Sequence, residues 1–214
     1  MGRFMNHKKW VVALALIATA LILTHLPVSE ADAAASASDF QIEGSTLTKY
    51  RGSDERVTIP DTVEVVGESA FENNQKVQFV VVPKSVKRMD AYVFWGCDNL
   101  EEVVLGKGLT AVDEYAFAGC TGLKQITIPE NVQSIDAQAF AGCTNLMDIY
   151  IPDTVTNISD DAFLNCDNVT IHADEGSVAA KFAQKLTEQK SKSPLVTAAP
   201  SATGGTSDVQ ATTE

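Results

Sequence analysis

The sequence contains few of the groups on which enzyme chemistry depends. Of the three histidines in the chain, only His172 lies beyond Ala33. The chain also lacks a glycine-rich phosphate loop and a Gly-x-Ser-x-Gly nucleophile elbow. A single histidine near a chain terminus is more often structural than catalytic. The sequence therefore predicts a protein that is not an enzyme, with no catalytic residue, no cofactor and no small-molecule substrate.

Basic residues are also scarce, because 16 Lys and Arg stand against 28 Asp and Glu, which gives a formal net charge of −12. A surface of this charge repels phosphate backbones and anionic lipids. We therefore expect no nucleic-acid partner and no direct binding to a membrane after any leader has been removed.

The longest apolar run is short for a membrane span. Residues 10–23 are uncharged and mostly apolar, and they follow Arg3, Lys8 and Lys9. A spanning helix needs about 20 apolar residues. A basic head, a short apolar middle and the small residues around Ala31 and Ala33 are typical of a signal peptide over residues 1–33. We expect cleavage and a secreted or surface-associated product, with retention of this segment as an anchor as the alternative.

Apolar periodicity is absent from residues 191–214, which are rich in Ser, Thr, Ala, Pro and Gly, so this tail is predicted to be disordered. Residues 34–39 are predicted to be a short linker.

The remainder of the chain carries a strict 23-residue repeat. Phenylalanine recurs at 71, 94, 117, 140 and 163, and proline at 60, 83, 129 and 152, with Gly106 in the one remaining slot. Seven positions are apolar in all five copies, over residues 57–171. A fixed period of this length indicates stacked units, none of which can bury its apolar edge alone.

The spacing within a copy predicts two extended passes and a turn. Ile126 and Ile128 alternate as in a strand, and Pro129 ends it because proline has no N–H for a ladder. Strands of successive copies are expected to pair in parallel about 4.8 Å apart. The aspartates that follow the second pass are predicted to cap a brief helical turn, with calcium binding left as a possibility. They are Asp90, Asp113 and Asp136.

The pattern L-x-x-I-x-I-P-x-x-V-x-x-I-x-x-x-A-F-x-G-C, at residues 123–143, resembles the BspA-like bacterial leucine-rich repeat. This resemblance implies a mainly β repeat solenoid, a right-handed coil with a parallel sheet on one face. It also implies an N-terminal hairpin cap at residues 40–56 and a C-terminal helical cap at residues 172–190, for which Ser177 suits the N-cap. Gly106-Lys107-Gly108 departs from the pattern and predicts a looser edge in the third copy, without a break.

Cysteine is sparse but regular, with one in each of the last four copies. Four cysteines in an exported protein ordinarily predict two disulfides. In one inward column, however, their Cβ vectors run parallel and are poorly aimed for bonding. Buried free thiols are the preferred interpretation, and zinc is disfavoured because its ligands must converge. The four are Cys97, Cys120, Cys143 and Cys166.

The surface that remains as a candidate functional site is the outward side of the first strand of each copy. Phe79, Val81 and Val104 are expected to form an exposed apolar cluster with a polar border, as protein-binding surfaces do. The predicted partner-binding residues are Phe79, Val81, Glu102, Val104, Gln125, Thr127, Asp148 and Tyr150. Adhesion is the role that the resemblance implies, with a host matrix or envelope protein as partner. The sequence thus predicts a non-catalytic binding module, with a passive spacer of the cell envelope as the alternative.

Overall fold

The computed structural model describes residues 35–192. The predicted signal peptide and residues 193–214 of the predicted tail lie outside the described residues. No helix within residues 35–192 is long and apolar enough to cross a membrane. The elements are η1 (Ala37–Asp39), β1 (Phe40–Glu43), β2 (Thr46–Tyr50), β3 (Arg56–Thr58), β4 (Val65–Val66), β5 (Phe79–Val81), β6 (Arg88–Met89), β7 (Glu102–Val104), β8 (Ala111–Val112), β9 (Gln125–Thr127), β10 (Ser134–Ile135), β11 (Asp148–Tyr150), β12 (Asn157–Ile158), β13 (Thr170–His172) and α2 (Val178–Lys192).

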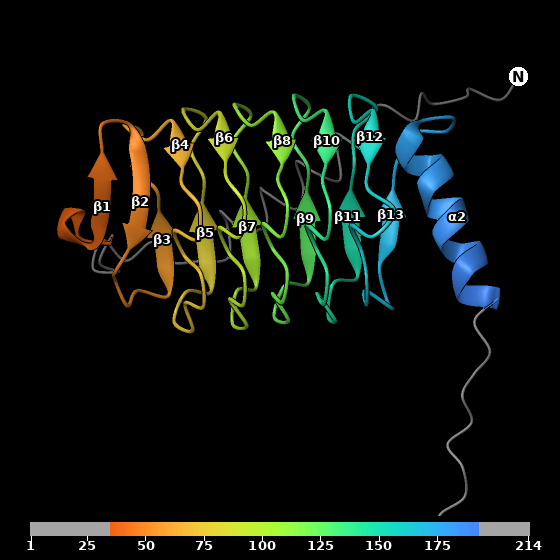
Figure 1. Cartoon of the computed structure of the whole chain (residues 1–214), viewed down its shortest axis with the longest axis horizontal. Helices are drawn as coiled ribbons and strands as arrows, with labels where there is room; N and C mark the ends of the chain where they lie inside the picture. Colours follow the sequence, from red (N-terminus) through yellow and green to blue (C-terminus); the bar gives the residue numbers. More distant parts are fainter. Residues whose placement is uncertain (1–34, 193–214) are drawn as a thin grey trace, which may run out of the picture.

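The strands form a solenoid with two rows, one of three-residue strands (β3 to β13, odd numbers) and one of two-residue strands (β4 to β12, even numbers) (Figure 1). We number the repeats laps 1 to 5 by their phenylalanines, 71, 94, 117, 140 and 163. Neighbouring laps pair in parallel at the repeat period, as where Val57 lies opposite Val80 and Val66 opposite Met89. The prediction of parallel pairing is confirmed. The second row adds a parallel ladder that the sequence analysis did not assign, because its backbone groups also need partners.

One file of aromatic rings runs through the core from cap to cap. The rings of Phe94, Phe117 and Phe140 stack with centroids 5.3 Å apart. All three side chains are fully buried. Each lap contributes one ring to the file, and the caps extend it at both ends. Its members in order are Phe40, Tyr50, Phe71, Phe94, Phe117, Phe140, Phe163 and Phe182. The predicted in-register stacking of the laps is therefore confirmed.

The predicted helical turn in each lap is wrong. The chain instead makes tight turns, as where Ala118 N–H donates to Tyr115 O at 3.1 Å. Tyr115 has φ 54°, in the left-handed region, which interrupts a right-handed helix. The predicted side-chain cap is replaced by a main-chain contact, because Ala116 N–H donates to the main-chain oxygen of Asp113 at 3.2 Å.

The four cysteines are buried free thiols, as the sequence predicts. Each thiol lies against the backbone of the preceding lap, so that the Cys120 Sγ–H donates to Phe94 O at 3.1 Å and that of Cys143 to Phe117 O at 3.1 Å. Burial raises the pKa of the Cys97 thiol to about 12, which keeps it protonated at neutral pH. The column therefore stabilises the coil as thiols.

Both ends of the solenoid are covered. β1 and β2 form an antiparallel hairpin. The second strand of this hairpin, β2, also pairs in parallel with β4 and so forms a rung of the solenoid. At the other end Ser177 Oγ accepts from Ala180 N–H at 3.1 Å, which confirms the predicted N-cap of α2. Phe182 of α2 packs on Phe163, with ring centroids 5.9 Å apart.

Lap 3 interrupts both rows of strands. The three-residue strands divide into the sheets β3-β5-β7 and β9-β11-β13, and the two-residue strands divide between β6 and β8. In lap 2, Val82 N–H donates to Val104 O of the next lap at 2.9 Å. Leu105 is the equivalent residue of lap 3, and its N–H donates no such bond within residues 35–192. Asp90 N–H likewise donates to Val66 O at 2.8 Å, and Asp113 N–H has no equivalent bond in the described part.

Lap 3 also differs from the other laps in the glycines of the corner between β7 and β8. A Cβ on Gly106 would lie 2.3 Å from Pro83 O, and one on Gly108 would lie 2.3 Å from Lys84 O. The corner of lap 3 therefore sits closer to lap 2 than any other residue type would allow. The sequence predicted a looser edge at this lap without a break. The expectation of no break is wrong for the strand ladders, which are interrupted there.

Candidate protein-binding surface

The three-residue strands present one continuous series of outward side chains, which we call the strand face. The central residue of each of β3, β5, β7, β9 and β11 is buried, and the flanking residues are exposed or half-buried. All eight predicted partner-binding residues are flanking residues of these strands. The structure thus brings them to one side of the molecule; their role in binding stays a prediction.

The N-terminal half of the strand face combines an apolar centre with one basic and one acidic side chain. The guanidinium of Arg56 lies over the ring of Phe79, 4.4 Å from its centroid. On the other side Phe79 is opposite Glu102, and in the same strands Val81 is opposite Val104. Partial burial raises the pKa of the Glu102 carboxyl, and the charge of Arg56 opposes that shift. Val81 remains 39% exposed.

The C-terminal half of the strand face is polar and aromatic. His172 Nε2 lies 2.7 Å from Asp148 Oδ1, and its ring stacks on that of Tyr150 with centroids 4.4 Å apart. Gln125 and Thr127 flank the buried centre of β9 and are exposed. This half therefore offers stacked rings and hydrogen-bonding groups where the other half offers aliphatic surface.

His172 is the strand-face residue that sequence reasoning missed. The sequence analysis placed it at the first residue of the C-terminal helical cap, residues 172–190. In the structure β13 pairs with β11 so that Asp148 lies opposite Thr170 and Tyr150 opposite His172. The sequence offset between β11 and β13 is therefore one residue shorter than the 23-residue repeat period. The alternation of Val169 and Ile171, both packed against the core, is the sequence signal that could have located β13.

A second aromatic group lies in the turns that follow β6 and β8. The rings of Tyr92 and Tyr115 stack with centroids 4.9 Å apart, and Trp95 meets Tyr92 edge-on at 6.4 Å. Trp95 is 40% exposed. Within residues 35–192 no cluster of three or more His, Cys, Asp or Glu side chains could hold a metal ion.

Solved structures similar to this chain are bacterial leucine-rich repeat proteins. A leucine rich cell surface protein from Faecalibacterium prausnitzii is 34% identical to this chain, with a TM-score of 0.61. The match covers 64% of this chain and 37% of the F. prausnitzii chain. The T. pallidum leucine rich repeat protein is 27% identical, with a TM-score of 0.62, and the match covers 65% of this chain and 71% of the T. pallidum chain. The pneumococcal vaccine antigen PcpA shares the fold at 18% identity and a TM-score of 0.55, and the match covers 64% of this chain and 35% of the PcpA chain.

This chain thus spans little more than a third of the first of these proteins. No curated protein matches it significantly. The family model for the BspA type leucine rich repeat region matches residues 46–170 in six copies. The match begins at β2, one copy earlier than the five laps predicted, which agrees with the parallel pairing of β2 to β4. The chain belongs to the BspA type leucine rich repeat family.

Proposed function

We propose that this protein is a non-catalytic binding module that recognises another protein through the strand face. One observation carries the proposal: Phe79, Val81 and Val104 occupy outward positions of β5 and β7, Val81 exposed and the other two half-buried. Arg56 lies over the Phe79 ring, and Glu102 is opposite Phe79 in the next strand. Apolar centres with charged rims are typical of protein-binding surfaces. The partner class we propose is a host matrix or cell-envelope protein, and the role is adhesion.

Family membership and a relative described as a cell surface protein support a location outside the cell. We propose a secreted or surface-associated protein, exported by means of residues 1–33. Fractionation of the producing cells, followed by mass spectrometry of the N-terminus, tests this part. Recovery of the intact chain in the cytoplasmic fraction would contradict it.

Binding is tested with residues 34–214 and purified extracellular-matrix proteins, immobilised one at a time. Phe79→Ser and Tyr150→Ser change one side chain in each half of the strand face. We expect each to weaken binding to a matrix protein at least tenfold, because a few aromatic anchors carry most of an interface's energy.

Trp95→Ser is the matched control, because it removes an exposed ring outside the strand face. Its affinity should match that of the unmodified protein, and melting temperatures confirm that all three variants fold. An equal loss of affinity in the control would refute the strand-face site. A complete lack of saturable binding to any matrix protein would favour the passive spacer.

A further inference from the structure

The corner between the two strands of each lap changes charge along the solenoid. The residue after the corner proline, or after Gly106 in lap 3, is Asp61, Lys84, Lys107, Glu130 and Asp153 in laps 1 to 5. Three residues later the series reads Glu64, Lys87, Thr110, Gln133 and Thr156. Laps 2 and 3 thus concentrate three lysines in slots that are acidic or neutral in the other laps, on a chain of net charge −12.

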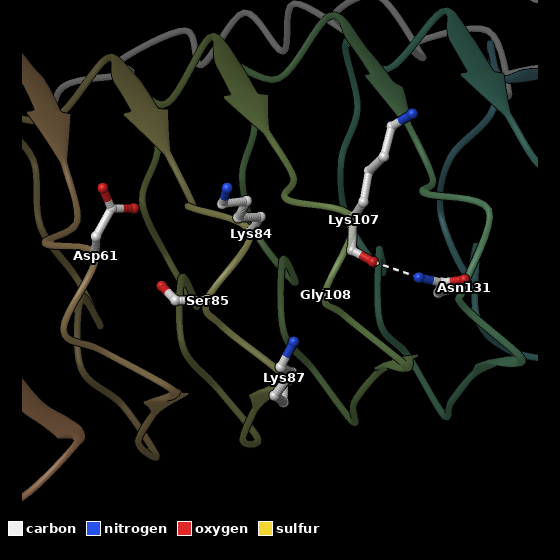
Figure 2. A pocket seen from close by; sticks show the side chains of 7 residues that line it. All are labelled: Asp61, Lys84, Ser85, Lys87, Lys107, Gly108 and Asn131. Carbon is white, nitrogen blue, oxygen red and sulfur yellow. Dashed lines mark hydrogen bonds between the residues drawn. The ribbon is translucent and has the colours of Figure 1, made fainter.

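These lysines surround a groove of about 530 Å³. Figure 2 shows Lys84 and Lys87 beside the hollow, with Asp61 on one side and Asn131 on the other, while the Lys107 side chain extends from its corner away from Lys84. The corner of lap 3 forms part of the lining, where Gly108 approaches the backbone of lap 2. Asn131 closes the far side by donating its Nδ2–H to Lys107 O at 2.6 Å.

The lysine charges in the groove are not neutralised by the described part of the protein. Lys124 and Lys185 each pair with a carboxylate, at 2.7 and 2.6 Å. Within residues 35–192 no carboxylate forms an ion pair with Lys84, Lys87 or Lys107. Lys84 and Lys107 occupy equivalent slots of consecutive laps, and like charges on neighbouring rungs repel. An anion between them would remove this repulsion.

The groove wall also holds an unused hydrogen-bond donor. Ser85 Oγ is buried and has no hydrogen-bond partner within residues 35–192. In the same slot of later laps, Asn131 and Thr154 donate to carbonyls of the preceding lap. Buried polar groups are nearly always paired, because leaving one unpaired destabilises the fold. An oxyanion in the groove would supply the missing acceptor after a change in the χ1 rotamer of Ser85.

We infer that this groove is a binding site for the phosphate or sulfate group of a small ligand. Lysine ammonium groups bind such oxyanions as point charges. The volume is in the range of small-molecule sites and leaves room for the moiety that carries the group. A long polyanion would meet the acidic remainder of the surface, whereas a single group is screened from it beyond about 8 Å at physiological ionic strength. The site is independent of the strand face.

Heteronuclear NMR titration of the purified protein at pH 7.5 tests the inference with four probes: inorganic phosphate, inorganic sulfate, glucose 6-phosphate and glucose. We expect saturable shifts of the Ser85 and Gly108 amides with the three anions and none with glucose. Tighter binding of glucose 6-phosphate than of inorganic phosphate would assign the site to a phosphorylated ligand, and equal binding would assign it to the free ion.

The decisive variant is Lys84→Gln/Lys107→Gln, which should weaken anion binding at least tenfold. Lys76→Gln/Lys181→Gln is the matched control, because it removes the same charge from two exposed lysines away from the groove. The control should bind as the unmodified protein does. Both double variants should fold, since the two groove slots hold acidic residues in other laps. Absence of saturable shifts, or equal weakening in both double variants, would overturn the site.

Discussion

At the scale of single residues, the repeat works by giving each side chain an identical neighbour one rung away. For the phenylalanines this is favourable, because stacked rings bury each other on both faces, as Phe117 does between Phe94 and Phe140. For the cysteines it aligns each thiol with a carbonyl of the preceding lap. For ionised side chains the same stacking is unfavourable, because like charges are brought together.

Asp113 illustrates this cost. Burial raises the pKa of its carboxyl, and the charges of Asp136 and Asp90 on the neighbouring laps raise it further, while Arg88 opposes them. Because the folded pKa lies above the unfolded value, ionisation of Asp113 destabilises the fold at neutral pH. The cost disappears as the pH falls through the folded pKa towards the unfolded value of about 3.9.

We therefore predict that Asp113→Asn raises the free energy of unfolding at pH 7. The gain should be less than about 1 kcal/mol, because solvent screens the half-buried carboxyl. Denaturant unfolding of the variant and the unmodified protein from pH 7 to pH 3.5 should show the two curves converging at the acid end. Asp98→Asn, at an exposed position, is the control and should leave stability unchanged. A loss of stability at pH 7 in the Asp113 variant would contradict the prediction.

At the scale of elements, the corner of lap 3 depends on the absence of a side chain. A Cβ on Gly108 would lie 2.3 Å from Lys84 O and 2.4 Å from Val86 O, both main-chain atoms that cannot rotate away. Gly108→Ala should therefore lower the free energy of unfolding by about 1–3 kcal/mol, the usual cost of overpacking. Thermal and denaturant unfolding measure the change.

Thr154→Ala is the control for this corner, since it alters the same slot in lap 5. It removes one hydrogen bond, from Thr154 Oγ1 to Val132 O at 3.1 Å, and should cost about 1 kcal/mol or less. If Gly108→Ala unfolds at the same denaturant concentration as the unmodified protein, the close seating of lap 3 on lap 2 is wrong.

At the scale of the whole molecule, the aromatic core is continuous, whereas the strand ladders are interrupted at lap 3. The aromatic file passes through lap 3 without a break, with rings 5.3 Å apart on each side. The strands do not, since β7 pairs only with lap 2 and β8 only with lap 4 within the described residues. Repeat proteins owe their stability to nearest-neighbour interfaces, so we expect lap 3 to be where backbone protection is lowest within the solenoid.

Amide hydrogen exchange followed by NMR tests this expectation. The amide of Leu105 should exchange at least tenfold faster than those of Val82 and Ile128, which donate to Val104 O and Tyr150 O at 2.9 Å. These two amides occupy the same slot in laps 2 and 4 and are the internal controls. Equal protection in all three laps would show that the ladder continues through lap 3.

The sequence by itself determined the solenoid, the five phenylalanines in one file, the buried thiol column and the side of the strands on which Phe79, Val81 and Tyr150 lie. It did so because an unbroken 23-residue period forces identical slots to stack, and alternation within a strand decides which side chains point inward.

Only the tertiary structure decided what depends on contacts between laps. The left-handed turns at Tyr92 and Tyr115, the seating of Gly108 on lap 2 and the unused hydroxyl of Ser85 follow from how neighbouring backbones meet. His172 reached the strand face because β13 pairs with β11 one position short of the repeat period, which sets His172 opposite Tyr150. A one-residue change of register is set by packing against the last rung, and the repeat period carries no information about it.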